Sequence, residues 1–357
     1  MSRSDFKQFD ERDFVFRNSK GKAKPAPQLP AGVPVADTHV HLNMLPDPGL
    51  AIARAAHHGL RFLCCMTDPA EEPQALGEDS TIWSAAEAYA AAQSWLDRAR
   101  SMLDEMEGTA TPLPRLRFAC GVHPHNARLW HGAREELLEL LHDPLTCCLG
   151  EIGLDYHYDF SPREDQRAVF AEQLRLAHET GLPVSLHLRE AHGDALQILR
   201  QEGVPQAGCI LHCFNLGPQE LAPFLELGCY VALGGPLTFR KSWYTRLACR
   251  DVPVERLLTE TDAPYMAPEP LRGTECEPAQ TVYTLRMLLD CFGFAGQERA
   301  QEIAQPRAID IENGAVAPKL GVPPQPHMDE GAFAEQVYRN AVDLLDRAPT
   351  AWQVGRT

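Results

Sequence analysis

Eight short apolar runs that alternate with helical patterns limit most strongly what this chain can fold into. The runs are rich in Val, Ile, Leu and Cys, and they cover residues 34–42, 60–67, 115–122, 146–153, 183–188, 207–214, 228–234 and 257–262. Helical patterns such as REDQRAVFAEQLRLAHETG separate most of them, and this one ends in Gly, as a helix C-terminus prefers. Strands alternating with helices form a parallel sheet, and eight such repeats close into a barrel. The sequence therefore predicts an α/β fold, a (β/α)8 TIM barrel.

An open, doubly wound sheet is the competing architecture. It would need a Gly-rich dinucleotide-binding turn after the first strand, whereas this strand runs into HVHLNMLPDPG. We therefore assign residues 34–347 to one barrel domain, between an N-terminal arm or linker (1–33) and a C-terminal tail (348–357). Helical insertions are expected at about 76–114 and, interrupted by Pro and Gly, at about 305–330.

The chain is acidic, with 357 residues and a formal net charge of −16 at pH 7. Its surface repels phosphate, which disfavours strong non-specific binding of nucleic acids but not a nucleic-acid substrate whose phosphates meet metal ions. No apolar run reaches the roughly 18 residues of a membrane span, and the N-terminus lacks an apolar signal core, so we expect a cytoplasmic protein with no membrane partner. The 11 cysteines include no CxxC pair and are expected to be buried as small hydrophobes.

Polar side chains follow the apolar runs at the points where the strands should end. The carboxyl ends of barrel strands carry the functional residues of this fold. The polar residues there are His39 and His41 on the first strand, His123 and His125 on the third, Glu151 and Asp155 on the fourth, His187, Arg189 and Glu190 on the fifth, His212 on the sixth, and Glu260 and Asp262 on the eighth.

The first strand, VADTHVHL, places two histidines on one face, because side chains two residues apart in a strand point the same way. A lone histidine there is usually an ordinary polar residue, but two imidazoles on one face can bind one metal ion. Buried and unpaired, such groups would be costly, and a shared metal centre would satisfy them together. We therefore predict six metal ligands, sufficient for two divalent ions: His39, His41, Glu151, His187, His212 and Asp262.

The group that bridges the two ions can also be predicted. Some two-metal barrels use a carboxylated lysine, but this chain has no lysine between Lys24 and Lys241. Glu151 is the suitable carboxylate on the fourth strand, so we expect it to bridge the ions. Mixed histidine and carboxylate ligands suit Mg²⁺, Mn²⁺ or Zn²⁺. Two such ions activate a water, and Asp262 is placed to take its proton, which predicts hydrolysis of a phosphodiester or an acyl bond with Glu151 and Asp262 as catalytic residues.

These motifs resemble those of the TatD-type metal-dependent deoxyribonucleases, within the amidohydrolase-like barrels. The matching stretches include ADTHVHLN, FACGVHPHNA, LGEIGLDYHYD, ILHCFN and LLTETDAPYMAP, which come in the family's order and lie within residues 34–280. The resemblance implies a (β/α)8 barrel with two or more divalent ions and 3′–5′ exonuclease or endonuclease action on DNA. It implies the same six ligands, and it adds His125 and Arg189 as substrate contacts. An Arg fork suits phosphate, although a structural salt bridge to Glu190 or an Asp is the alternative for Arg189.

The chain departs from the family pattern in places. RGTECEP stands at 272–278 where relatives usually have RGKRNEP, and HLRE stands where they have HSRD. Our leading hypothesis is a nuclease that cleaves DNA, with RNA as a further candidate substrate. The acidic change favours the alternative, a hydrolase of another ester or amide bond, in a small molecule or an aminoacyl-tRNA, that uses the same two-metal site. A scaffold that binds a partner through its basic arm is a third reading, against which the intact ligand set argues.

Overall fold

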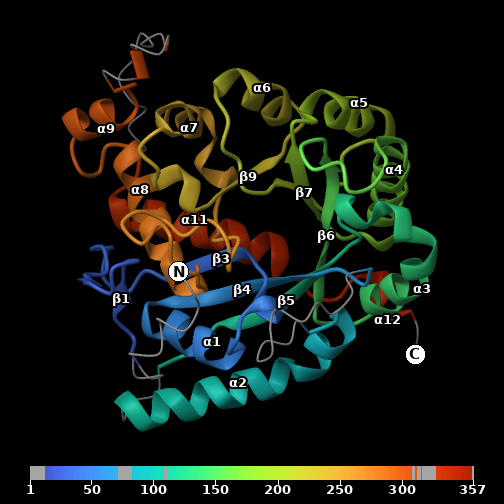
Figure 1. Ribbon diagram of the computed structural model, residues 1–357, viewed down its shortest axis with the longest axis horizontal. Helices are drawn as coiled ribbons and strands as arrows, with labels where there is room; N and C mark the ends of the chain where they lie inside the picture. The colour runs from blue at the N-terminus through green and yellow to red at the C-terminus, as the bar shows by residue number, and fades with distance from the viewer. Residues whose placement is uncertain are drawn as a thin grey trace.

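The computed structural model describes residues 13–70, 83–107, 111–307, 310–311, 315 and 327–355. Its centre is one sheet of eight parallel strands, whose order in the sheet is their order in the chain (Figure 1). The strands are β3 (Val35–Val40), β4 (Leu60–Thr67), β5 (Arg115–Cys120), β6 (Thr146–Asp155), β7 (Val184–Arg189), β8 (Cys209–Leu211), β9 (Tyr230–Leu233) and β10 (Leu257–Thr259). Each strand lies within one predicted apolar run or extends at most two residues beyond it.

Helices connect successive strands and lie outside the sheet (Figure 1). They are α1 (Pro48–His57), α2 (Ala85–Glu107), α3 (Trp130–Leu141), α4 (Arg163–Thr180), α5 (His192–Glu202), α6 (Pro218–Glu226) and α7 (Trp243–Ala248), followed after β10 by α8 (Thr281–Cys291), α9 (Gln297–Ile303), α11 (Glu330–Leu345) and α12 (Ala351–Val354). The helix α4 ends at Gly181 in the left-handed conformation (φ 69°), as its sequence predicts. The fold is the predicted (β/α)8 barrel.

Two apolar layers hold the barrel together. The larger layer lies between the strands and the surrounding helices. The smaller one fills the barrel with inward side chains such as Phe62 and Met66, and it includes Leu344 and Leu345 of α11. The Asn340 amide of α11 donates hydrogen bonds to the carbonyls of Val254 (2.6 Å) and Leu257 (2.9 Å). Helix α11 therefore covers the end of the barrel at which β10 begins, which leaves the carboxyl ends of the strands for the site.

The segments beyond the predicted barrel domain also pack against it. In the N-terminal arm, β1 (Phe16–Arg17) pairs with β2 (Ala23–Lys24), and Phe14 and Phe16 are buried. The Phe16 ring stacks on His58 at the end of α1, 4.2 Å between centroids. In the C-terminal tail, the Trp352 ring stacks on His142 at 4.7 Å. The domain boundaries remain a prediction, and most of the proposed insertion at 305–330 lies outside the described residues, whereas α2 occupies the centre of the one at 76–114.

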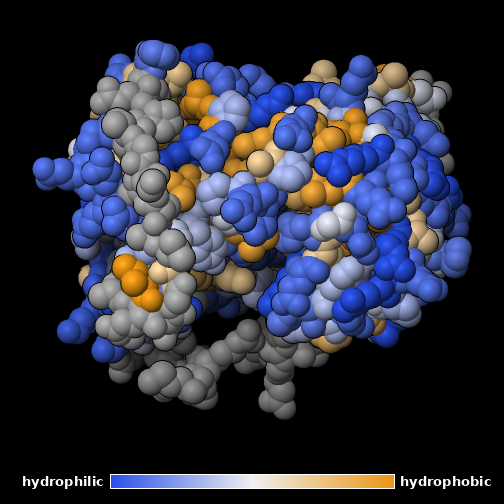
Figure 2. All heavy atoms as spheres, turned by 90° about the horizontal axis from the view of Figure 1, so that it is seen from above, coloured by the Kyte–Doolittle hydropathy of each residue, from blue (hydrophilic) through white to orange (hydrophobic). Residues whose placement is uncertain are grey.

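All 11 cysteines are described, none forms a disulfide, and ten are buried, as the sequence predicts. None of the described helices has the length and apolar character needed to cross a membrane. Seen from the side of α5 and α6, the surface is largely hydrophilic, with apolar residues showing between the polar ones (Figure 2).

The barrel closes where the chain after β10 meets β3. The carbonyl of His39 accepts a hydrogen bond from the Asp262 N–H (2.9 Å), and the N–H of His41 donates to the Ala263 carbonyl (2.8 Å). The fully buried Asp37 adds to this seam, because its carboxylate accepts hydrogen bonds from the Thr261 hydroxyl (2.6 Å) and the Thr261 N–H (3.0 Å). Burial raises the pKa of Asp37 to about 8, even though these hydrogen bonds act in the opposite direction.

Replacing Thr261 by Val should weaken this seam, because it removes a hydroxyl that satisfies a buried carboxylate oxygen. We expect Thr261→Val to lower the free energy of unfolding by about 1–3 kcal/mol in urea titrations followed by circular dichroism. Thr245→Val is the matched control, because Thr245 is equally buried and its hydroxyl has no partner among the described residues. Equal losses in the two variants would contradict the role of the Asp37–Thr261 contact.

Candidate metal centre

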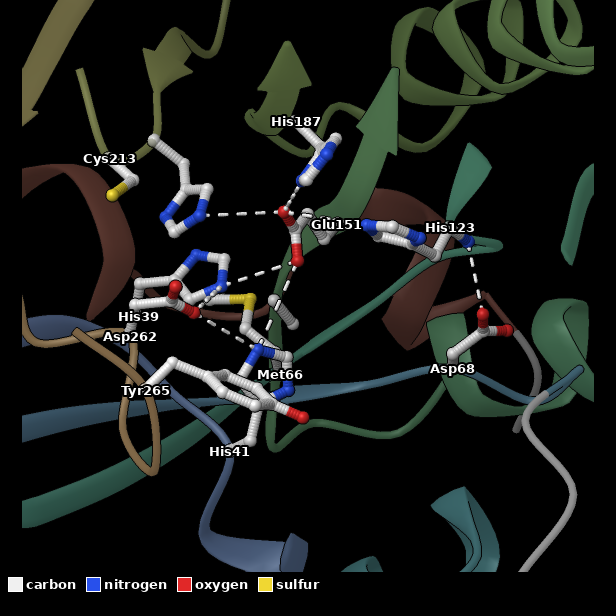
Figure 3. A network of polar contacts seen from close by, with 12 residues as sticks. His39, His41, Met66, Asp68, His123, Glu151, His187, Cys213, Asp262 and Tyr265 are labelled. Carbon is white, nitrogen blue, oxygen red and sulfur yellow. Dashed lines mark hydrogen bonds and ion pairs between the residues drawn. The ribbon is translucent and has the colours of Figure 1, made fainter. Parts of the chain in front are cut away.

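The six predicted ligand residues lie together at the carboxyl ends of the strands, and all of them except His212 are labelled in Figure 3. They come from five strands or the residues that follow them: His39 and His41 (β3), Glu151 (β6), His187 (β7), His212 (β8) and Asp262 (β10). They form sets of three residues whose possible ligand atoms lie within 4.8 Å of one another. One set is His39, His41 and Asp262, and another is Glu151, His187 and His212. Residues from opposite ends of the chain thus form one polar cluster in a largely apolar barrel.

The carboxylate of Glu151 lies between two groups of imidazoles. Its Oε1 is 2.6 Å from His187 Nδ1 and 3.5 Å from His212 Nε2. Its Oε2 is 3.4 Å from His39 Nε2 and 4.0 Å from His41 Nε2. Because each oxygen faces a different group, one carboxylate reaches both halves of the cluster, which is the arrangement that a bridging ligand needs.

Asp262 completes the half of the cluster formed by the first strand. Its Oδ1 lies 3.5 Å from His41 Nε2 and 3.8 Å from His39 Nε2. The backbone at Asp262 has a φ of 63°, which is uncommon for a residue with a side chain. The seam hydrogen bond from its N–H to the His39 carbonyl holds it in this conformation. Closure of the barrel therefore sets the position of this carboxylate.

A glycine allows β6 and β7 to approach closely enough to bring His187 beside Glu151. Gly153 pairs with His187 in the parallel register and has a φ of 143°. A Cβ at this position would lie 2.1 Å from the His187 carbonyl oxygen. Only glycine fits there, which explains why GEIGLDY carries a glycine two residues after its glutamate.

Several buried polar atoms of the cluster have no hydrogen bond. Neither ring nitrogen of the fully buried His39 has a hydrogen-bond partner among the described residues, and the same holds for Glu260 Oε2. Buried polar atoms without partners are costly, so native proteins rarely keep them without another use. Neutral imidazole nitrogens and carboxylate oxygens are ligands for divalent metal ions. The residues of the site therefore fit the two ions that the sequence predicts.

The charges of the cluster support one another. Burial alone would raise the pKa of Glu151, but His212 and His187, followed by His39 and His123, outweigh it and hold this pKa well below its ordinary value. Burial lowers the pKa of His187, yet the Glu151 and Asp155 carboxylates raise it to about 9. The pKa shifts thus favour the ionised form of the Glu151 and Asp155 carboxylates and the protonated form of His187.

Two further carboxylates orient the imidazoles, and sequence reasoning gave them no role. Asp155 is fully buried, and its Oδ2 lies 3.0 Å from His187 Nε2 and 2.9 Å from His125 Nε2. Glu260, also fully buried, has its Oε1 3.1 Å from His212 Nδ1. Each contact leaves the opposite nitrogen of the liganding ring directed at Glu151. Carboxylates in this second layer fix the tautomer and orientation of metal-binding histidines.

Three more residues border the site. His123 Nε2 is 3.8 Å from Glu151 Oε1, and its backbone N–H donates to Asp68 (3.1 Å). The thiol of Cys213 lies within 4.8 Å of a possible ligand atom of His212 and of Asp262. The sequence places His123 and Cys213 at strand ends, but nothing in their spacing distinguishes a bordering residue from a ligand.

The two residues predicted to contact substrate lie beside the cluster. His125 uses its Nε2 to contact Asp155. The Arg189 guanidinium lies over the Tyr158 ring, 4.6 Å from its centroid. Glu190, the alternative partner of Arg189, lies instead 2.8 Å from His157 Nδ1. The substrate-binding roles of His125 and Arg189 remain predictions.

Backbone strain concentrates around this site. Five non-glycine residues among those described have a positive φ, and all follow the carboxyl ends of β6, β7, β8 or β10: Asp159, Glu190, Cys213, Asp262 and Met266. Such conformations cost free energy and persist where the surrounding structure requires them, most often at functional sites. The strained backbone at the ends of these strands therefore indicates a functional site.

A parallel barrel with histidines and carboxylates gathered at its strand ends defines a class of metal-dependent hydrolases. Residues 36–307 match the model of the family described as TatD related DNase, so the chain belongs to the TatD family. The predicted family, and with it the class of enzyme, is confirmed.

Relatives and solved structures agree with this assignment. YcfH of Escherichia coli K12, an uncharacterized metal-dependent hydrolase, is 39% identical over 184 residues, which cover 52% of this chain and 69% of YcfH. A protein of Klebsiella pneumoniae named 3′-5′ ssDNA/RNA exonuclease TatD is 39% identical over 186 residues, 50% of this chain and 69% of that protein. The structure of the TatD homologue YjjV from Escherichia coli K12 superposes with a TM-score of 0.60 at 24% identity and covers 88% of this chain and 98% of YjjV, which shows the shared fold.

Asp155→Asn should loosen the orientation of His187 and His125, because an amide nitrogen would replace one of the carboxylate oxygens at the two rings. We expect the affinity for a divalent ion to fall about 10–100-fold, measured by isothermal titration of the metal-stripped protein. Asp194→Asn is the matched control: Asp194 accepts from the Tyr156 hydroxyl at 2.6 Å, away from the ligand imidazoles. Unchanged affinity in Asp155→Asn would show that Asp155 does not orient these histidines.

Proposed function

We propose that this protein is a metal-dependent nuclease that hydrolyses phosphodiester bonds of single-stranded DNA from the 3′ end, with RNA as a second possible substrate. The observation that carries the proposal is the position of Glu151, one oxygen of which faces His187 and His212 while the other faces His39 and His41. Two ions on such a carboxylate suit the displacement of an oxygen from phosphorus. The exonuclease name of the Klebsiella pneumoniae relative supports this choice of substrate.

The residues would divide the work by position. Glu151, His187 and His212 would hold one ion, and Glu151, His39, His41 and Asp262 the other. Bound divalent ions supply an acidified water and positive charge for the phosphate oxygens. Asp262 is the more accessible of the two acids, with 15% of its side chain exposed against 7% for Glu151. We therefore assign the proton of the attacking water to an Asp262 carboxylate oxygen.

Arg189 and His125 would hold the substrate. The Arg189 guanidinium has no carboxylate within 4.0 Å in the described part of the chain, so its donors are available for a phosphate. A guanidinium can bind two phosphate oxygens at once. Because the protein as a whole is negatively charged, the phosphates of the substrate would be bound by these local cations and by the metal ions.

Hydrolysis of a different ester or amide bond is the second candidate. Glu275 is exposed in the loop where relatives usually have basic residues and an asparagine, and the neighbouring Cys276 is buried. An acidic side chain there disfavours a long polyanion. Turnover of a small ester or of an aminoacyl-tRNA by metal-loaded protein that leaves DNA and RNA uncut would favour this candidate.

Glu151→Gln should remove nuclease activity. Each of the two ions needs one oxygen of Glu151, and an amide has only one oxygen. We expect the rate of 3′-end shortening of labelled single-stranded DNA to fall at least about 100-fold. This is the upper limit of the activity lost when a residue that only orients a metal ligand is replaced. Glu172→Gln carries the same change on α4, where Glu172 accepts from Trp130 Nε1 at 2.9 Å, and it should retain full activity. Equal activity of Glu151→Gln and wild type would exclude Glu151 as the bridging residue.

Metal ions should also stabilise the folded protein, because they bind buried groups that only the folded chain brings together. We expect the melting temperature of chelator-treated protein to rise when Mg²⁺, Mn²⁺ or Zn²⁺ is added, in proportion to the logarithm of the metal concentration at saturation. A His39→Ala variant should lose part of this rise, because His39 would hold only one of the two ions. A melting temperature that none of the three ions raises would contradict the assignment of a metal centre.

A further inference from the structure

Exposed aromatic side chains gather at the rim of the metal centre. Nine large apolar side chains among the described residues are exposed, and four of them lie in the two loops that follow β6 and β10: Tyr158, Phe160, Tyr265 and Met266. Tyr158 is 47% exposed and Phe160 56%. Large apolar groups left in water by a protein with an extensive core indicate a surface that binds something.

Tyr158 and Phe160 form one pair of parallel rings. Their planes differ by 9° and their centroids lie 5.2 Å apart, which is an offset stack. The His125 ring stands edge-on to both, 4.8 Å from Phe160 and 5.6 Å from Tyr158. His125 in turn lies 5.9 Å from His187, whose Nδ1 contacts Glu151. Only one imidazole therefore separates the pair from the candidate metal ligands.

The loop that carries the pair is fixed in place. Asp155 Oδ1 accepts hydrogen bonds from the backbone N–H groups of His157 and Tyr158, both at 2.9 Å. The Ser161 hydroxyl donates to the His125 carbonyl at 2.7 Å, and the Gln166 amide donates to the Ser161 carbonyl at 2.9 Å. The rings are thus held exposed on a rigid loop, and binding a partner would not require the loop to be ordered first.

Two arginines flank the same pair. Arg189 lies over the Tyr158 ring, and Arg128 donates from Nη1 to the Phe160 carbonyl at 3.4 Å. Within the described ranges neither guanidinium has a carboxylate within 4.0 Å, although the chain contains 49 acidic residues and 33 basic ones. Cations beside exposed aromatic rings attract a ligand that has both negative charge and flat apolar faces. Single-stranded nucleic acid is such a ligand, because its bases stack on aromatic rings while its phosphates meet cations.

We propose that Tyr158 and Phe160 form a stacking platform for the bases at the 3′ end of a single-stranded nucleic acid, with Arg128 and Arg189 beside the adjoining phosphates. This inference rests on the proposed nuclease function and specifies how its substrate is held. The platform binds unpaired bases, whose faces are open, and a base inside a duplex offers none. It therefore directs the site toward single strands and frayed ends without reading their sequence.

Two oligodeoxynucleotides test the platform, one with normal 3′-terminal nucleotides and one with abasic tetrahydrofuran residues in their place. Metal-loaded wild type should cleave the normal strand with a kcat/KM higher by at least about 5-fold, the lower limit for one stacked base. In the double variant Tyr158→Ala/Phe160→Ala the ratio of the two kcat/KM values should approach one. Tyr158→Phe keeps the ring and should keep the ratio, as should Met106→Ala, which alters an exposed apolar residue on α2.

Binding measurements separate failure of the platform from failure of the proposed function. Fluorescence anisotropy of the labelled normal strand, measured in a Glu151→Gln background, should show weaker binding when Tyr158 and Phe160 are both Ala. If both strands are cleaved equally by wild type, or if the double variant keeps the wild-type ratio, the platform is wrong and the nuclease stands. If the strand binds through the two rings but is never cleaved, the nuclease is wrong and the platform stands. Absence of both binding and cleavage overturns both.

Discussion

The hydrogen bonds between β3 and the chain after β10 support the whole site, because they close the barrel and place its ligands in the same step. The Asp262 N–H bonded to the His39 carbonyl joins one ligand residue to another through their backbones. Asp37, buried beneath them, holds Thr261 with both carboxylate oxygens. A barrel that opened at this seam would separate His39 and His41 from Asp262, so folding and site assembly depend on the same contacts.

A second layer of buried carboxylates sets the direction of the imidazoles. Asp155 contacts His187 and His125, and Glu260 contacts His212. Asp155 also accepts backbone N–H groups, and Glu260 accepts that of Cys213 at 2.5 Å. These hydrogen bonds tie each orienting acid to the turn that follows a strand. Asp155 has a further part, since its other oxygen fixes the loop that carries Tyr158. The candidate metal centre and the proposed stacking platform thus depend on one aspartate.

Much of this arrangement could be predicted from the sequence, and there are physical reasons why the rest could not. Apolar runs with polar residues at their ends identify strands and the side chains that meet at one rim, so the proximity of Glu151 to His187 followed from fold and position alone. Their binding of metal stays a prediction. The contact between Asp37 and Thr261 joins residues 224 positions apart, so no local sequence pattern predicts it. Likewise, the Pro- and Lys-rich composition of residues 18–32 typifies a linker and gives no sign that the preceding Phe14 and Phe16 are buried against the barrel.

The central claim is that one carboxylate, Glu151, joins two metal ions. Anomalous diffraction from crystals grown with Mn²⁺ tests it most directly. We expect two anomalous peaks about 3.5–4 Å apart, one beside each oxygen of Glu151, with His187 and His212 around the first and His39, His41 and Asp262 around the second. A single peak that touches neither Glu151 oxygen, or two peaks that share a different residue, would contradict it.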